Sequence, residues 1–419
     1  MTKDDQSPRT DTVLLAATRT TTVASRMAIR LAEAGIEVAA IYPSRTHPLA
    51  STRAVGTHFH YSMVDPLQSI VGALRKSNAG IVIPCDGLTV RHLHALHATV
   101  PAAEDGAKTA EVLRRSLGDP AAYLLIDSRH EVQTAARAEG LSAAESFALG
   151  RTADPENIAQ TLPFPWVLKA DYIAGGAGTH VVSSLSAAKR IIRRAGAPPN
   201  LATAMGQLVV EGDRAAMGEW LRAMRPGLSA QRPVSGVAAS TVASCWSGEI
   251  LGLISVQAVL STTKTNSPPV KVQIVDSEPM VRAARLMAEK LGLSGFQDFQ
   301  FILDTDSGKA TLVEINPYCV APVYLNTGPG HDPVDAFCRR WTGRPPAAQA
   351  PVHPGRLIAY FPQSWVADPS DPVLKTGAYD VPAQDPELVN QVIRMVRRNR
   401  RYSAIQSGLR TVLGRDTSG

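Results

Sequence analysis

Short apolar runs alternate with stretches of helical periodicity over the first hundred residues. The runs TVLLAA, IEVAAIY and AGIVIP predict buried strands at 12–17, 36–42 and 79–84. Apolar residues spaced three and four apart predict a helix after each strand, near 20–34, 66–76 and 88–98. Strands that alternate with helices form parallel sheets, whose ligands bind at the carboxyl ends of the strands. The pattern therefore predicts an α/β fold for this part of the chain.

The middle of the chain carries longer strands joined by tight turns. After a helix near 128–139, PFPWVLKAD predicts a short strand at 163–171, and THVVSS predicts the strand that returns from it. SAQRPVSG, at 229–236, predicts a strand that runs into a linker. Alternating apolar residues then predict two hairpins, one on each side of a helix at 279–291. The hairpins cover 237–260, with a turn at Ser247–Gly248, and 298–316, with a turn at Asp306–Gly308.

The composition is that of an ordinary globular protein, since 44% of the 419 residues are hydrophobic and 19% are charged. The longest apolar stretch, at 250–260, is far too short to span a bilayer. The N-terminus lacks the apolar core of a secretory signal, so we expect a cytoplasmic protein without membrane contacts. The four cysteines are scattered without a C-x-x-C spacing, which predicts free buried thiols.

Much of the net charge of +6 lies near the C-terminus, where 392–415 holds seven arginines and no acidic residue. Apolar residues at helical spacing predict a pair of amphipathic helices with arginine-rich outer faces. A solvated helix face, packed against the body of the protein, is the favoured interpretation. A surface for RNA or for an acidic partner is the alternative. The sequence also leaves open whether the protein forms a homo-oligomer.

Two stretches carry residues suited to phosphate and metal chemistry. Lys169 lies on an apolar strand six residues before GGAG (175–178), and both a lysine and a glycine-rich turn suit phosphate oxygens. The turn of the second hairpin places Gln300 beside Glu314. Asn316 points to the same face as Glu314, because alternate residues of a strand share a face. Three oxygen ligands would thus converge, which suits Mg²⁺ with substrate phosphates completing its shell.

The order of these pieces resembles the ATP-grasp superfamily. The resembling segments, within about 116–340, are VLKAD with GGAG, QRPVSG, and GFQDFQFILDTDSGKATLVEINP. Residues 12–100 resemble the Rossmann-like domain that precedes the ATP-grasp core. The resemblance implies four parts: a disordered N-terminus at 1–11, a Rossmann-like domain at 12–115, an ATP-grasp domain at 116–343 with its lid at about 166–235, and a linker with the arginine-rich helices at 344–419.

The resemblance also implies roles for individual residues. Arg129 and Lys169 would contact the ATP phosphates and act in catalysis. The nucleotide-binding set that it implies is Arg129, Lys169, Gly175, Gly176, Gly178, and the backbone of Arg232 and Val234, which would read the adenine edge. The metal ligands that it implies are Gln300, Glu314 and Asn316, which would hold one or two Mg²⁺ ions, with Mn²⁺ as a substitute.

Two departures from the family pattern affect the expected chemistry. The family usually has EINPR, and this chain has Tyr318 in place of the arginine, so a bidentate charged contact is lost. In the resemblance, QRPVSG corresponds to the hinge that contacts adenine. The stretch GVAAST, which begins with the last glycine of that segment, lacks the glutamate that often holds the ribose. Gln300 and Arg129 occupy positions where carbamoyl-phosphate-synthetase-like members also have glutamine and arginine.

The activity implied by the resemblance is that of an ADP-forming ligase. Such an enzyme phosphorylates a small-molecule carboxylate with ATP and then joins it to an amine or a thiol. Two alternatives stay open: phosphorylation of bicarbonate or carbamate, and a nucleotide-binding sensor or scaffold without turnover. Phosphoryl transfer needs positioning and charge neutralisation more than a protein base, and the residues above supply both.

Overall fold

The computed structural model describes residues 12–100, 104–149, 154–171, 178–195, 227–261, 269–348, 350, 352–376 and 379–398. Several expected features lie outside these residues: the N-terminus at 1–11, Gly175 and Gly176, and the second arginine-rich helix. No helix among the described residues is long and apolar enough to cross a membrane.

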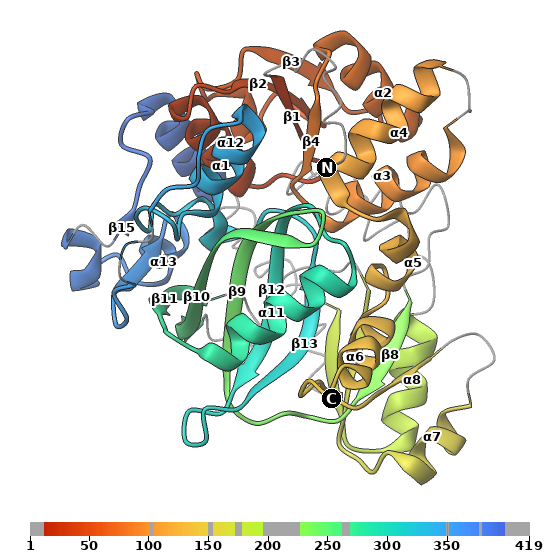
Figure 1. Cartoon of the computed structure of the whole chain (residues 1–419). Helices are drawn as coiled ribbons and strands as arrows, with labels where there is room; N and C mark the ends of the chain where they lie inside the picture. Colours follow the sequence, from red (N-terminus) through yellow and green to blue (C-terminus); the bar gives the residue numbers. More distant parts are fainter. Residues whose placement is uncertain are drawn as a thin grey trace, which may run out of the picture.

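The first part of the chain forms a parallel sheet with helices on both faces (Figure 1). The strand order is β3-β2-β1-β4, and every neighbouring pair is parallel, as the sequence predicted. Met27 and Leu31 of α1 pack on one face, while Leu74 of α2 and Leu113 of α4 pack on the other. The elements are β1 Thr12–Ala16, α1 Val23–Glu33, β2 Glu37–Tyr42, β3 Thr57–His60, α2 Pro66–Ser77, β4 Ile81–Pro84, α3 Gly87–Thr99 and α4 Glu104–Leu117.

Two features of this region were not anticipated. The sequence analysis did not predict β3, which is short and mostly exposed. It also did not predict α4, and the expected domain boundary at 115–116 falls in the last turn of that helix. The histidines of α3 are hydrogen-bonded or stacked rather than clustered: His92 bonds with the hydroxyl of Tyr61, and His94 with Asp127.

A seven-stranded sheet of order β13-β12-β9-β10-β11-β14-β15 forms the centre of the molecule (Figure 1). The helix α11 covers one face, where Met280 and Met287 pack against Phe299. The opposite face packs on α12 through Phe337 and Trp341. The elements are β9 Val237–Trp246, β10 Glu249–Ser261, β11 Pro269–Ile274, α11 Glu278–Lys290, β12 Gly295–Leu303, β13 Ala310–Asn316, α12 Pro333–Thr342, β14 Leu357–Tyr360 and β15 Tyr379–Asp380.

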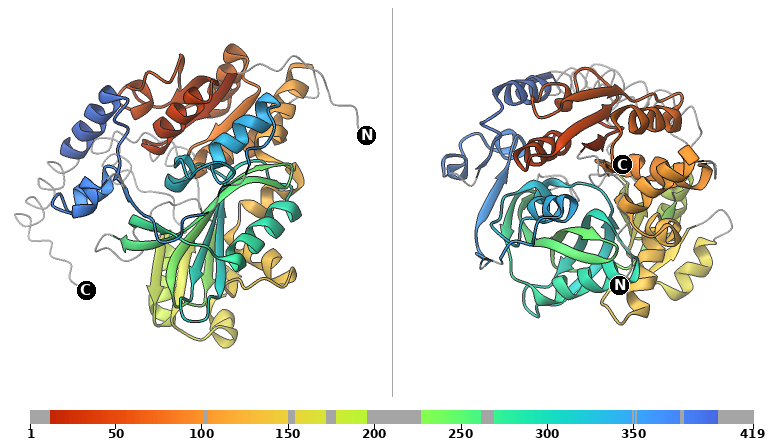
Figure 2. Two further views of the ribbon diagram at one scale, coloured as in Figure 1. Left: turned by 60° about the vertical axis from the view of Figure 1, so that its left-hand side comes forward. Right: turned by 45° about the horizontal axis from the view of Figure 1, so that its top comes forward.

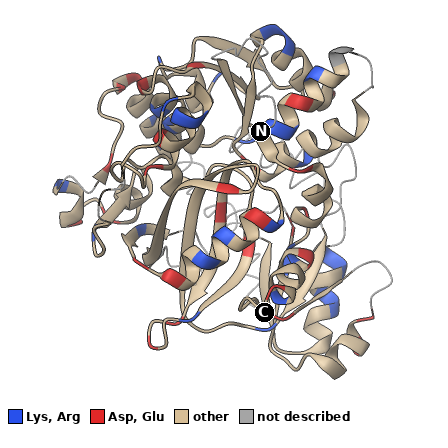
Figure 3. Ribbon diagram, in the orientation of Figure 1, with Lys and Arg blue, Asp and Glu red and all other residues tan. Residues whose placement is uncertain are grey.

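Both predicted hairpins are present in this sheet. The strands β9 and β10 pair antiparallel through the turn at Ser247–Gly248, and β12 pairs with β13 beyond Asp306–Gly308. The sequence analysis missed β11, which follows its partner β10 along the chain, and β14 and β15, which join the sheet from a later part of the chain. Both acidic and basic residues occur along α11 in Figure 3, so its solvent side is charged although its inner side is apolar.

A third, smaller sheet of order β5-β8-β6-β7 lies beside the central one (Figure 1). Its core is built around Trp166, which is fully buried and stacks on Phe164. The elements are α5 Tyr123–Ile126, α6 Arg129–Ala138, β5 Ser146–Ala148, α7 Pro155–Thr161, β6 Trp166–Ala170, β7 Thr179–Val182, α8 Leu185–Ala195 and β8 Leu228–Gln231.

The C-terminal segment returns to the first part of the molecule. A helix at 386–398 packs Leu388 and Val392 against Ile29 of α1, and the second view in Figure 2 shows the two helices side by side. The arginines of this helix at 394, 397 and 398 are exposed. In the described part of the tail, the helix packs on the body of the protein and its arginines face the solvent. Short helices elsewhere are Pro48–Ala50, Pro120–Ala122, Ala321–Tyr324, Gln363–Ala367 and Pro372–Lys375.

Candidate active site

The hairpin β12–β13 carries a polar face in the middle of an apolar sheet. Its register sets Gln300 opposite Glu314 and Asp298 opposite Asn316, so all four side chains share one face. The predicted neighbourhood of Gln300, Glu314 and Asn316 is therefore present. The amide nitrogens of Gln300 and Asn316 both donate to Asp298, at 2.8 and 3.0 Å. Each amide oxygen remains available to another partner.

Asp298 was missed by the sequence analysis, although it stands two residues before Gln300 on the same strand. The residue is 1% exposed, and one of its carboxylate oxygens has no hydrogen-bond partner. Burial raises the pKa of Asp298 to about 6 against the lowering effect of its hydrogen bonds. An orphaned buried carboxylate oxygen beside a second carboxylate and two amide oxygens is a donor set that fits a hard divalent cation.

No group of three or more His, Cys, Asp or Glu that could hold a metal occurs in the described ranges. A cation on this face would be held by the carboxylates of Asp298 and Glu314 and by the two amide oxygens, with oxygens of a bound ligand completing its shell. This arrangement suits Mg²⁺, which commonly keeps phosphate or water oxygens in its shell.

Two cations flank the Glu314 carboxylate. Arg129, in the first turn of α6, pairs with Glu314 and donates to the carbonyl of Ala170. Its guanidinium also lies 3.5 Å from Asp171, whose carboxylate accepts the Arg129 backbone N–H at 3.3 Å. Lys169 on β6 is the second cation. The structure thus brings together Arg129, Lys169 and Glu314 from three separate segments, as expected, and adds Asp171.

The electrostatics of this cluster favour full ionisation of Glu314. Burial alone would raise the pKa of its carboxyl, but Arg129 and Lys169 outweigh burial and lower it to about 2. Burial lowers the pKa of Lys169, and Glu314 partly offsets that effect. Burial raises the pKa of Asp171 to about 6 in spite of Arg129. The cluster therefore holds a firmly charged Glu314 between cations that have lost much of their hydration.

The expected hinge lies next to this cluster. The strand β8 pairs with β6 so that Ser229 stands opposite Lys169, and Arg232 follows the strand directly. The backbone N–H of Arg232 donates to the carbonyl of Glu145 at 3.0 Å, because β8 also pairs with β5. Only the carbonyl of Arg232 is left for a ligand, together with the backbone of Val234. Gly178 of the glycine-rich turn is placed by its carbonyl, which accepts from Ala170.

Tyr318 lies at the end of the polar face that carries Asp298, Gln300, Glu314 and Asn316. Burial raises the pKa of its phenol, and the nearby carboxylates of Glu314 and Asp298 raise it further, so the side chain is neutral. The next residue, Cys319, donates its backbone N–H to Pro84 at the carboxyl end of β4, at 3.1 Å. The face is thereby joined to the carboxyl end of β4 in the parallel sheet.

The loop after β1 completes this edge. Asp86 accepts hydrogen bonds from the backbone and the hydroxyl of Thr18, both at 2.7 Å, and from the backbone of Arg19 at 3.2 Å. His47, which is fully buried, contacts the carbonyl of Arg19 from the other side at 3.1 Å. The TRTTT turn is therefore anchored through Thr18 and Arg19 at the carboxyl end of β1.

Comparisons with known proteins give a consistent result at the level of the fold. No family model and no curated protein matches the sequence. Among solved structures, an N5-carboxyaminoimidazole ribonucleotide synthetase in complex with ADP superposes with a TM-score of 0.57 and 15% identity, over 82% of this chain and 80% of that one. The biotin carboxylase domain of the 2-oxoglutarate carboxylase of Hydrogenobacter thermophilus, bound to MgADP and bicarbonate, gives a TM-score of 0.55 and 16% identity, over 82% and 73%.

A third similar structure is an L-amino acid ligase from Bacillus licheniformis, with a TM-score of 0.54 and 12% identity over 84% of this chain and 79% of that one. All three proteins are ATP-grasp enzymes. The chain has the ATP-grasp fold, preceded by a Rossmann-like parallel α/β domain.

Proposed function

We propose that this protein is an ATP-dependent, ADP-forming ligase that activates a small-molecule carboxylate as an acyl phosphate and joins it to an amine or a thiol. The observation that carries the proposal is the Arg129–Glu314–Lys169 cluster beside the oxygen-rich face of β12 and β13. Cations for phosphate oxygens and oxygens for a divalent cation stand within one site, which is the requirement of metal-assisted phosphoryl transfer.

In this proposal the cations bind and orient the nucleotide. Arg129 and Lys169 neutralise the β- and γ-phosphates, aided by the glycine-rich turn of Gly175, Gly176 and Gly178. The carbonyl of Arg232 and the backbone of Val234 face the adenine edge. Mg²⁺, or Mn²⁺ in its place, would add positive charge on the transferring phosphate and is assigned to Gln300, Glu314 and Asn316, to which the structure adds Asp298.

Glu314 has two successive partners in this scheme. Without nucleotide it balances the buried charges of Arg129 and Lys169. Once phosphate oxygens approach these cations, the carboxylate becomes available to the metal ion. Phosphate oxygens would then replace the Glu314 carboxylate as the counter-charge of Arg129 and Lys169. Neither the free nor the nucleotide-bound protein would leave these buried cations without a negative partner, and an unpaired buried cation would destabilise the fold.

The carboxylate substrate is expected between the metal-binding face and the TRTTT turn. Thr18, Arg19 and Asp86 line the carboxyl edge of the first sheet, and Tyr318 approaches from the other side. An acid bound there would meet the phosphoryl group with the neutral phenol of Tyr318 as a hydrogen-bond donor.

A second candidate is phosphorylation of bicarbonate or carbamate. Gln300 and Arg129 favour it through their resemblance to carbamoyl-phosphate-synthetase-like enzymes, and one similar structure holds bicarbonate. A third candidate is a nucleotide-binding sensor without turnover. Only Tyr318 favours it, because this residue replaces the arginine that the family usually has at that position.

The test is ADP and phosphate release from the full chain with ATP and Mg²⁺, against amino acids, small carboxylates and bicarbonate. Release that depends on an organic acid and increases with an amine supports the ligase. Release with bicarbonate alone favours the second candidate. Nucleotide binding without release in any mixture refutes both enzymatic proposals.

A further inference from the structure

A cavity opens beside β10, where the chain beyond β11 turns away from that strand. The two strands pair from Val256 onward, and the N–H of Val275 makes a last contact with the carbonyl of Ser255 at 3.0 Å. In the described part of the chain, no strand pairs with the outer edge of β10 between Ile250 and Ile254. The space beside this edge has a volume of about 290 Å³, which is close to the lower end of the range for small-molecule sites.

The cavity is separate from the candidate active site. Ile254 lines the cavity and pairs with Val242 of β9, which in turn pairs with Asp298 of β12. The edge of β10 is therefore two strands away from Asp298, or about 10 Å at the usual spacing between strands. None of the lining residues is among those assigned to the nucleotide or to the metal ion. A ligand in this cavity would therefore not displace ATP.

Helix α11 and the segment before β14 form two of the walls. Val281 and Arg285 of α11 both line the cavity, and they share one face of the helix because they are four residues apart. The segment before β14 is fixed to the end of β11. Ile274 donates its N–H to the carbonyl of Arg356 and accepts the N–H of Gly355, both at 2.9 Å.

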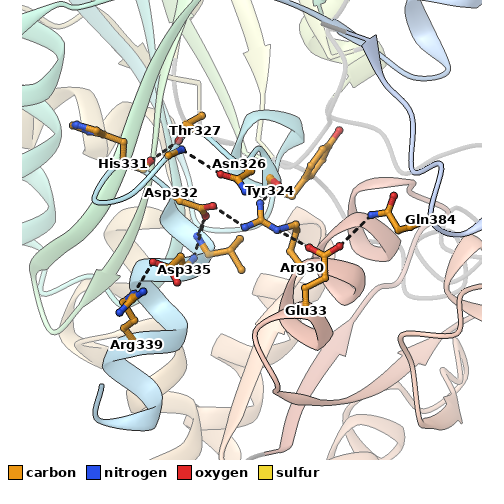
Figure 4. Close-up of polar contacts among 12 residues, drawn as sticks. Arg30, Glu33, Tyr324, Asn326, Thr327, His331, Asp332, Asp335, Arg339 and Gln384 are labelled. Carbon is orange, nitrogen blue, oxygen red and sulfur yellow. Dashed lines mark hydrogen bonds and ion pairs between the residues drawn. The ribbon is translucent and has the colours of Figure 1, made fainter. Parts of the chain in front are cut away.

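The loop at 327–331 forms a third wall (Figure 4). The hydroxyl of Thr327 donates to the carbonyl of His331 at 2.8 Å, and the ring of His331 contacts the carbonyl of Ala350 at 2.6 Å. The next residue, Asp332, caps α12 and pairs with an arginine of α1 at 2.7 Å. These contacts hold the wall in place, so the cavity exists before any ligand binds.

The charged residues at the cavity leave an excess of positive charge. Arg285 and Arg356 are both exposed, and within the described ranges neither side chain has an ion pair or a hydrogen bond. Asp276 is the one acidic residue of the lining, and it pairs with neither arginine. With His331 and His353 neutral, the lining carries a net charge of one positive unit. An anion is therefore attracted to the cavity.

We propose that this cavity binds a small organic acid that has one carboxylate and a short apolar chain. The two oxygens of the carboxylate suit the guanidinium groups of Arg285 and Arg356, and its single charge balances the excess of the lining. The apolar chain would lie along Leu253, Val281 and Val352. The inference does not depend on the proposed ligase activity, because no residue of the candidate active site takes part.

The alternative content of the cavity is water alone. An apolar chain that displaces this water gains about fourfold in affinity for each methylene group that it buries. A ligand that has both the chain and the charge should therefore bind more tightly than a ligand that has only one of them.

The experiment is calorimetry of the full chain with hexanoate, acetate and hexan-1-ol. We expect hexanoate to bind at least about 10-fold more tightly than acetate, which lacks the chain, and several-fold more tightly than hexan-1-ol, which lacks the charge. The proposal is wrong if hexanoate does not bind, or if hexan-1-ol binds as tightly. Tighter binding of hexyl phosphate than of hexanoate would contradict the assignment of a carboxylate.

Substitutions at the two arginines locate the bound hexanoate. Arg285→Gln and Arg356→Gln should each weaken hexanoate about 2- to 5-fold, the range for exposed ion pairs, and the double variant about 4- to 25-fold. Arg282→Gln is the matched control, because Arg282 is exposed on α11 and does not line the cavity. Its affinity for hexanoate should equal that of wild type. Val281→Phe, which fills part of the cavity, should weaken hexanoate more than acetate.

Hexanoate is itself a small carboxylate, so its binding must be distinguished from binding as a substrate. In the catalytic site it would bind equally to wild type, to the double variant and to Arg282→Gln, and that result would overturn the proposal. The double variant should bind ATP as tightly as wild type. If no acid causes ADP release, the ligase proposal fails, but the expected differences in hexanoate affinity stay the same.

Discussion

Replacing Glu314 by glutamine separates a metal ligand from an ordinary strand end. Glutamine keeps the size and one oxygen of the side chain but removes its charge. The pKa of Glu314 falls from the model-compound value of 4.5 to about 2. At about 1.4 kcal/mol for each pKa unit, this depression corresponds to about 3 kcal/mol of stabilisation at neutral pH. We expect Glu314→Gln to lower the free energy of unfolding by about that amount, because Arg129 and Lys169 lose their shared counter-charge.

The effect on nucleotide binding should depend on the metal. In EDTA, removal of a negative charge near the phosphates should leave ATP affinity unchanged or increase it. With Mg²⁺ the affinity should fall, and turnover should drop roughly 10²- to 10³-fold, as for loss of one preorganised electrostatic group. Opposite responses in EDTA and in Mg²⁺ would be the signature of a metal-binding carboxylate.

The assays are calorimetry of ATP in both conditions, ADP release over a range of Mg²⁺ concentrations, and urea unfolding. The control is Glu145→Gln, whose carboxylate forms a half-exposed pair with Arg232 at 3.0 Å. That change should cost less than about 1 kcal/mol. Turnover of Glu314→Gln within a few-fold of wild type at every Mg²⁺ concentration would refute the metal-site assignment.

Three further changes test other parts of the structure. Lys169→Met should weaken ATP binding by about 1.5–3 kcal/mol in calorimetry. The control Lys189→Met, at an exposed pair with Glu156, should leave the ATP affinity unchanged. If Lys169→Met binds ATP as tightly as wild type, Lys169 is not part of the site. Leu388→Ala should destabilise the protein by about 2–5 kcal/mol in urea unfolding, because this side chain is 1% exposed against α1; a change below 0.5 kcal/mol would show that the helix at 386–398 does not stabilise the fold. Burial raises the pKa of Asp380 from 3.8 to about 6, so between these pH values the folded state binds a proton that the unfolded state has lost. As pH rises from about 4 to about 6, wild type should therefore lose stability relative to Asp380→Asn, by at most about 3 kcal/mol. Parallel pH profiles of the two proteins in urea unfolding would contradict this.

Local patterns predicted the parts of the site that lie on one hairpin. The turn at Asp306–Gly308 fixes the register of β12 and β13, and alternation then fixes which side chains share a face. Gln300, Glu314 and Asn316 could be placed together for that reason. Asp298 obeys the same alternation, but a carboxylate that is 1% exposed could not be recognised without knowing that its face is enclosed by the first domain.

Contacts between distant segments had no local signature. The sequence analysis assigned Arg129 to the same site as Glu314 only because of the family resemblance. It did not anticipate the contact of Arg129 with Asp171. The strands β14 and β15, of four and two residues, are too short to carry a pattern of their own. The strand β11 does alternate, with Val270, Val272 and Ile274 buried, and the sequence analysis overlooked it. The contacts of Asp380 with Arg26 and with Tyr324 join segments up to 354 residues apart, and they follow from the pairing of β15 with β14.

The neutral side chain of Tyr318 affects the charge balance around Glu314 and Asp298. An arginine at this position would lie near Glu314 and Asp298 and would compete with a divalent cation for both carboxylates. A neutral phenol leaves Asp298 without a cationic partner, as its raised pKa of about 6 and its orphaned oxygen reflect. The positive charge that the ATP-grasp family usually places at the position of Tyr318 is available instead from Arg129 and Lys169, which both act on Glu314, so Glu314 keeps its cations while Asp298 keeps an oxygen without a partner.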